Sequence, residues 1–200
     1  MATHFTNIDL TKLNIGQIET GNNGGKYMRV SYNGDQLKNV QLGESVHDTL
    51  RCPFGSEPVS QDQPNKFCIK LEVSNHLKTF IETIDSTVKQ AVNDNSLTHR
   101  STLRDGTMST TLKLKIMQDT QIFTTTLKDN KITAPKQASI SDITPNSQIL
   151  AIMKIQGGVY FIENNYGTSM VATQILVVNN ADQGQTMSFA LGNDITISED

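Results

Sequence analysis

The chain has 200 residues, of which 36% are apolar, and a formal net charge of −3 at pH 7. This length fits one domain with a sizeable core, and so small a charge excludes a general electrostatic attraction to nucleic acid or membranes. No stretch approaches the length of an apolar membrane span, and residues 1–5 begin no apolar leader. We therefore expect an intracellular protein that is neither secreted nor bound to a membrane.

Charge is unevenly distributed along the chain. Residues 1–154 hold all 17 Lys and Arg against 15 of the 20 acids, whereas residues 155–200 hold the remaining five acids and no cation. This asymmetry predicts that the Lys- and Arg-free segment 179–200 is an acidic tail that binds partner proteins. Its candidate partner-binding residues are Asp194, Glu199 and Asp200. The alternative is a terminus that is only solvated.

The first predicted strand follows a polar N-terminal segment. Residues 1–25 are polar and end in a glycine-rich turn, which is typical of an extension to a domain. Apolar and polar residues alternate over Lys26–Tyr32, as in a half-buried strand. Asn33-Gly34 then predicts a tight hairpin, with a returning strand over 37–42.

A single amphipathic helix is predicted in the middle of the chain. Apolar residues recur every three or four positions over 77–92, and Ser74 or Asn75 can cap the start of the helix. Strands are predicted before it over 66–73 and after it over 111–117, 122–128, 132–133, 149–155, 159–162 and 170–178. About eight short strands with one helix favour a mainly-β domain over 26–178, with an OB-fold-like barrel carrying elaborations. A β-sandwich is the alternative.

Signatures of enzymes and metal sites are missing from the sequence. The four histidines stand alone, and the two cysteines, Cys52 and Cys68, lack the partners that a zinc site needs. The glycine-rich residues 21–26 lack the spacing and the Ser/Thr of a phosphate loop. We therefore expect no catalytic residue, no metal and no cofactor.

Basic and aromatic side chains on the predicted strands suit a nucleic-acid surface. Lys113 and Lys115 alternate with apolar residues, so they share one face about 7 Å apart, close to the phosphate spacing of an extended single strand. The candidate DNA-binding cations are Arg29, Lys66, Lys70, Arg100, Arg104, Lys113 and Lys115. The candidate base-stacking rings are Tyr27, Tyr32, Phe54, Tyr160 and Tyr166. The alternative is a solvated strand face whose lysines prevent edge pairing.

Several short motifs follow one another in an order that resembles a known protein family. KYMRVSYNG follows a glycine-rich turn, then come CPFG, FCIKLEV, the amphipathic helix, TLKLK, GVYF and YGTSM. In this order they resemble the single-stranded DNA-binding proteins of nucleo-cytoplasmic large DNA viruses, a family related to the OB-fold single-stranded DNA-binding protein of short-tailed phages. The resemblance covers roughly residues 20–180.

The resemblance implies a five-stranded OB barrel that binds single-stranded DNA without sequence preference in viral replication, recombination or repair. It implies phosphate contacts at Lys70, Lys113 and Lys115, and stacking or core roles for Tyr160 and Tyr166. The acidic tail would contact viral replication proteins or cover the groove, a homodimer is a further expectation, and the location would be the host cytoplasm, a viral factory or the nucleus. The alternative function is a structural or virion-assembly protein with a β-sandwich.

Overall fold

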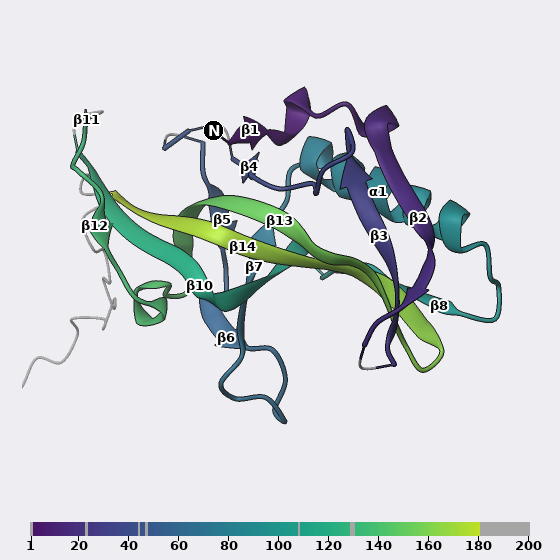
Figure 1. Ribbon diagram of the computed structural model, residues 1–200. Helices are drawn as coiled ribbons and strands as arrows, with labels where there is room; N and C mark the ends of the chain where they lie inside the picture. The colour runs from purple at the N-terminus through teal and green to yellow at the C-terminus, as the bar shows by residue number, and fades with distance from the viewer. Residues whose placement is uncertain are drawn as a thin grey trace, which may run out of the picture.

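The computed structural model describes residues 2–22, 24–43, 45–46, 48–107, 109–128 and 131–180. These residues form one sheet of 14 strands with one α-helix, so the prediction of a mainly-β chain with one amphipathic helix is confirmed (Figure 1). Among them, the main strand order β1-β4-β13-β14-β10-β7-β6 does not close on itself. The sheet is therefore open along this path, and the choice between an OB-fold-like barrel and a β-sandwich stays a prediction.

The strands and the helix occupy the following segments: β1 Thr3–His4, β2 Leu13–Thr20, β3 Lys26–Tyr32, β4 Val40–Leu42, β5 Leu50–Cys52, β6 Ser56–Pro58, β7 Phe67–Glu72, α1 Asn75–Val92, β8 Thr98–Arg100, β9 Leu103–Asp105, β10 Thr110–Lys128, β11 Lys131–Ile132, β12 Lys136–Gln137, β13 Ser147–Ile162 and β14 Asn165–Asn180. Three short 3-10 helices, Phe5–Asn7, Leu10–Lys12 and Ile140–Asp142, complete the described elements.

Three long strands form the centre of the sheet. β14 pairs in parallel with β10 and antiparallel with β13, and register shifts interrupt both ladders without ending the strands. These irregularities explain why the sequence pattern divided each long strand into shorter segments, since a β-bulge changes which residues face the core. Figure 1 shows β10, β13 and β14 running past the helix into an arm that carries β11 and β12.

Helix α1 packs on one side of this sheet. Ser74 caps it by accepting a 3.2 Å hydrogen bond from the Leu77 amide, and Asn93 ends it in the left-handed conformation, as its sequence predicts. Its buried apolar residues join Leu112, Leu114 and Met170 of the sheet in a single core. We call the side of the sheet that carries these residues the core face, and the opposite side the open face.

The N-terminal segment and the predicted hairpin differ from expectation. Residues within 1–25, expected as a polar extension, form β1 and β2, and Phe5 and Leu13 are buried in the core. Asn33 and Gly34 do form a tight turn, with φ of 51° and 82°. The chain then leaves β3, however, and β4 pairs with β13 and β1. Long-range pairing with β13 therefore prevails over the local hairpin.

The membrane expectation and the predicted tail have different outcomes. Within the described residues, no helix is both long and apolar enough to cross a membrane. Residues 181–200, which include Asp194, Glu199 and Asp200, lie outside the described residues, and the predicted tail stays a prediction.

Gly158 lets β3 approach β13. Its φ is +91°, and a Cβ there would lie 2.1 Å from the Met28 carbonyl oxygen, whereas a Cβ on Gly157, with φ of +69°, would meet nothing within 4 Å. We expect Gly158→Ala to lower the free energy of unfolding by about 3 kcal/mol and the melting temperature by about 6–12 °C, because strain and a backbone clash combine. Gly157→Ala, the control, should cost only about 1 kcal/mol. Thermal denaturation tests both, and equal melting temperatures would contradict the proposed close approach.

Candidate nucleic-acid interface

Strand register places four lysines together on the open face. Lys70 of β7 lies directly opposite Lys113 of β10, which brings their Cβ atoms to about 5 Å. In the next row, Lys115 of β10 and Lys154 of β13 lie on either side of Val171 in β14. Since paired residues on neighbouring strands project to the same side, the lysines of both rows point away from α1.

Few carboxylates neutralise these lysines. Lys70 Nζ lies 2.5 Å from Glu57 Oε1, and Lys113 Nζ donates to the Val59 carbonyl at 3.3 Å. Among the described residues, no carboxylate lies within 4 Å of Lys113, Lys115 or Lys154. Burial lowers the pKa of Lys115, and the neighbouring ammonium groups of Lys113 and Lys66 lower it further. The lysines thus create a local positive potential on a chain of negative net charge.

A groove runs beside the lysines. Its volume is about 860 Å³, and its walls include Phe54, Lys70, Lys113 and Arg104. The Phe54 side chain is 58% exposed, and Lys70 Nζ lies 5.5 Å from the centre of its ring. Arg104 reaches this face because β9 pairs it with Thr111 of β10, and its guanidinium donates to backbone carbonyls. The groove therefore joins cations to one exposed aromatic ring.

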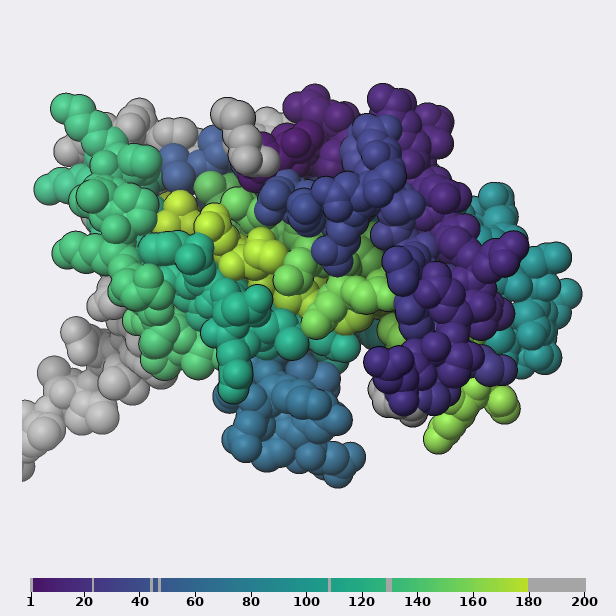
Figure 2. Space-filling model, viewed as in Figure 1, coloured from purple at the N-terminus to yellow at the C-terminus, as the bar shows by residue number. Residues whose placement is uncertain are grey.

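The segment that joins β6 to β7 supplies one more cation. Figure 2 shows the 56–66 region as a lobe that projects from the body of the molecule. The Val59 amide donates to the Lys66 carbonyl at 2.7 Å, so the two ends of the loop meet beside the lysines. Lys66 is exposed, and its charge acts on Lys115. Of the seven predicted cations, Lys66, Lys70, Arg104, Lys113 and Lys115 thus gather in one region.

Arg29 and Arg100 lie elsewhere on the open face, with two tyrosines. Pairing across five strands forms the row Arg100, Gly167, Tyr160, Tyr27 and Glu19. Glu19 binds Arg29 Nε at 3.2 Å and accepts from the Tyr27 hydroxyl at 2.8 Å, while Arg100 donates to Asn165 at 2.7 Å. Along β14, Gly167 and Val171 lie four residues apart and project to the same side. The row that contains Gly167 therefore lies about 13 Å from the row of Lys115 and Lys154.

Two predicted stacking residues belong to the core. Tyr166 is only 5% exposed, and its ring packs against His99 at 5.2 Å and Phe161 at 6.1 Å. The predicted stacking role of Tyr166 is therefore wrong, and its place is the core role that the resemblance also implied. Tyr32 projects to the core face as well, and its hydroxyl accepts from the Asp9 amide at 3.3 Å. Alternation along β3 explains this, because Tyr27 and Tyr32 are an odd number of residues apart.

Sequence reasoning missed Lys154 and Arg51. Lys154 lies in an apolar stretch, so no alternation marked it, and only the pairing of β13 with β14 shows its neighbours. Arg51 lines the groove, but Glu72 binds it at 3.2 Å. Among the described residues, no group of three His, Cys, Asp or Glu side chains could hold a metal ion. Burial also raises the pKa of the Cys52 thiol to about 11, which leaves little thiolate at neutral pH.

No protein-family model matches the chain, and no curated protein matches its sequence. Among solved structures, the chain is similar to the single-stranded DNA-binding protein of bacteriophage Enc34. A C-terminally truncated form is 10% identical, and the match covers 86% of this chain and 97% of that chain with a TM-score of 0.44. A structure of the same phage protein in complex with ssDNA is 11% identical, with 83% and 94% covered and a TM-score of 0.44. The viral family predicted from the motif order is not among these findings and stays a prediction.

The depressed pKa of Lys115 provides a test of the lysine cluster. Removing the charge of Lys113 should raise the pKa of Lys115 towards its ordinary value, because one like charge no longer opposes protonation. We expect an NMR titration of the lysine Cε signals to show this rise in Lys113→Met. Lys128→Met, on the arm, is the control and should leave the titration of Lys115 unchanged. An unchanged Lys115 titration in Lys113→Met would mean that the two ammonium groups do not interact.

Proposed function

We propose that the protein is a non-catalytic, sequence-independent single-stranded DNA-binding protein. The observation that carries this proposal is the set of Lys70, Lys113, Lys115 and Lys154 in two adjacent rows on the open face. Lys70 and Lys113 lie directly opposite one another, and like charges in such positions destabilise a sheet, a repulsion that the Glu57 carboxylate at Lys70 offsets in part. An extended polyanion would relieve this repulsion by placing phosphates between the ammonium groups.

One exposed and two half-buried aromatic rings favour a single strand over a duplex. Phe54 lies in the groove beside Lys70, and Tyr27 and Tyr160 lie in the row that includes Arg100. A ring on such a surface can stack on an unpaired base, at about 1–3 kcal/mol per base, without distinguishing one base from another. In a duplex the base faces are occupied by their neighbours, so the rings would gain nothing. Cations combined with rings therefore support binding of single strands without sequence preference.

The choice of DNA and the biological role rest on the motif order. We propose action in viral DNA replication, recombination or repair, with the tail at 179–200 contacting viral replication proteins and with the chain forming a homodimer. Within the described residues, nothing in the site requires DNA over RNA. Binding experiments should therefore compare oligo-dT with oligo-U of equal length.

Reversing two lysine charges tests the phosphate contacts. We expect Lys113→Glu with Lys115→Glu to weaken oligo-dT binding by about a hundredfold at low salt and to reduce the slope of log K against log[salt] by about 1.4. Fluorescence anisotropy at several salt concentrations measures both. The matched control is Lys128→Glu with Lys131→Glu, which makes the same charge change on the exposed residues of the arm. Equal losses in the two double variants would show that only net charge matters and would contradict the proposed site.

The absence of tryptophan allows a single-tryptophan reporter of base stacking. We expect Phe54→Trp to bind oligo-dT and to lose much of its fluorescence on binding, since a base would stack on the indole. Phe54→Ala should weaken binding by roughly tenfold, at the lower end of the stacking energy. Ile132→Trp, on a 52% exposed side chain of the arm, is the control reporter. Quenching in the control but not at position 54 would place the nucleic acid elsewhere.

A further inference from the structure

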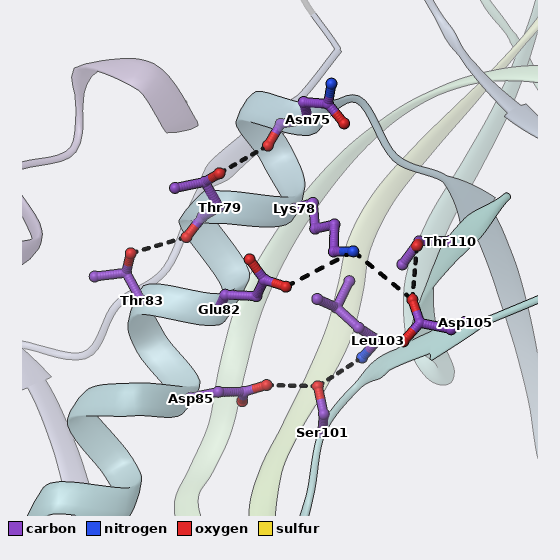
Figure 3. Close-up of polar contacts among 10 residues, drawn as sticks. All are labelled: Asn75, Lys78, Thr79, Glu82, Thr83, Asp85, Ser101, Leu103, Asp105 and Thr110. Atoms are coloured by element: carbon purple, nitrogen blue, oxygen red, sulfur yellow. Dashed lines mark hydrogen bonds and ion pairs between the residues drawn. The ribbon is translucent and has the colours of Figure 1, made fainter.

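Helix α1 contains a buried carboxylate whose partners lie in the segment 98–105. The Asp85 side chain is 7% exposed, and Asp85 Oδ2 accepts a 2.5 Å hydrogen bond from the Ser101 hydroxyl. Its other oxygen, Oδ1, lies 3.5 Å from His99 Nε2, and neither of these two atoms has a hydrogen-bond partner among the described residues. Figure 3 shows the carboxylate pointing from the helix towards Ser101, whose oxygen in turn accepts from the Leu103 amide at 3.0 Å. One carboxylate thus holds Ser101 by a hydrogen bond and lies next to His99 of the same segment.

The segment 98–105 bridges two strands at the edge of the proposed interface. β8 pairs in parallel with the start of β14, and β9 pairs with the start of β10. The described β10–β14 pairs begin only at Lys115 and Val171, so this segment spans the region where the two strands diverge. The Lys113 amide also donates to the Thr102 carbonyl at 3.0 Å, which joins the middle of the segment to the lysine cluster.

Side chains of this segment divide between the two faces. His99 pairs with Tyr166 and Leu103 with Leu112, and both partners project to the core face. Arg100 and Arg104 pair with residues of the open face, so they project to the side where the lysines lie. The groups held by Asp85 and the two arginines therefore lie on opposite sides of one short stretch of backbone.

We propose that Asp85 is a positioning residue for DNA binding, because its hydrogen bond holds Ser101 against the helix and thereby presents Arg100 and Arg104 on the open face. This inference rests on the proposed function. A buried carboxylate contributes little net stability, since desolvation offsets most of its interactions. A short hydrogen bond from a buried side chain does restrict the position of its partner, which is the property that two arginines on a bridging segment require.

An exposed ion pair on the same helix provides a matched control. Lys78 Nζ lies 3.8 Å from both Glu82 and Asp105, and the Asp105 side chain is 81% exposed (Figure 3). This pair also joins α1 to the end of the segment, but solvent screens it and its contribution is small. Lys78→Gln therefore breaks a link between the same two elements without disturbing the buried anchor.

The decisive experiment is a variant cycle measured by oligo-dT binding across a range of salt concentrations. Asp85→Leu keeps a similar volume but accepts no hydrogen bond, and it should weaken binding about tenfold and reduce the salt slope by about 1.4, the value for two lost phosphate contacts. Asp85→Asn keeps an acceptor for Ser101 and should restore most of the affinity. Arg100→Gln with Arg104→Gln should match Asp85→Leu, and the three changes combined should add little further loss because they remove the same contacts.

A second measurement needs no DNA. In Asp85→Leu, trypsin should cleave after Arg100 and Arg104 at least about tenfold faster than in the wild type, since a released segment is more accessible. Lys78→Gln should match the wild type in both assays. Wild-type affinity, salt slope and cleavage in a folded Asp85→Leu variant would overturn the proposal. If the wild type itself does not bind oligo-dT, the proposed function fails, and the cleavage rates then decide whether Asp85 holds the segment.

Discussion

Pairing of β14 with β10 and β13 is the constraint on which the rest of the structure depends. These ladders set the register that places Lys115 and Lys154 on either side of Val171. The same ladders put Met170 and Ala172 on the core face, where α1 covers the sheet. A shift of one residue would exchange the two faces, burying lysines and exposing the core. Burial of the apolar face therefore fixes where the cations lie.

Local charge on this molecule differs from net charge. The chain carries −3 overall, yet the groove beside β7 and β10 gathers lysines with few acidic partners. Glu57 neutralises Lys70, whereas Lys113 and Lys115 have no such partner among the described residues. Interactions between exposed charges fade over about 8 Å in physiological salt. Glu72 and Asp105 also line the groove, where Glu72 pairs with Arg51 and Asp105 with Lys78. A phosphate in the groove would therefore respond mainly to the ammonium groups of Lys70 and Lys113.

Helix α1 connects the core to the open face through the segment 98–105. Its apolar side packs in the core through residues such as Ile81 and Ile84, and Asp85 follows them on the same buried side. The carboxylate meets the bridging segment 98–105, where His99 and Ser101 face inward. Rigid elements hold side chains more accurately than loops do, and in the proposed mechanism the helix gives this segment such support.

The sequence by itself determined the local features. Period-two alternation marked Lys26–Tyr32 and the faces of Lys113 and Lys115, and three- to four-residue spacing with Ser74 or Asn75 as cap marked α1. Only the tertiary structure decided that β4 leaves its hairpin, that Tyr166 is buried and that Lys154 joins Lys115. Alternation depends on neighbours along the chain and is visible in the sequence. Strand pairing can join residues far apart in the chain, such as Val40 and Met153, and its register follows from burying the whole core at once.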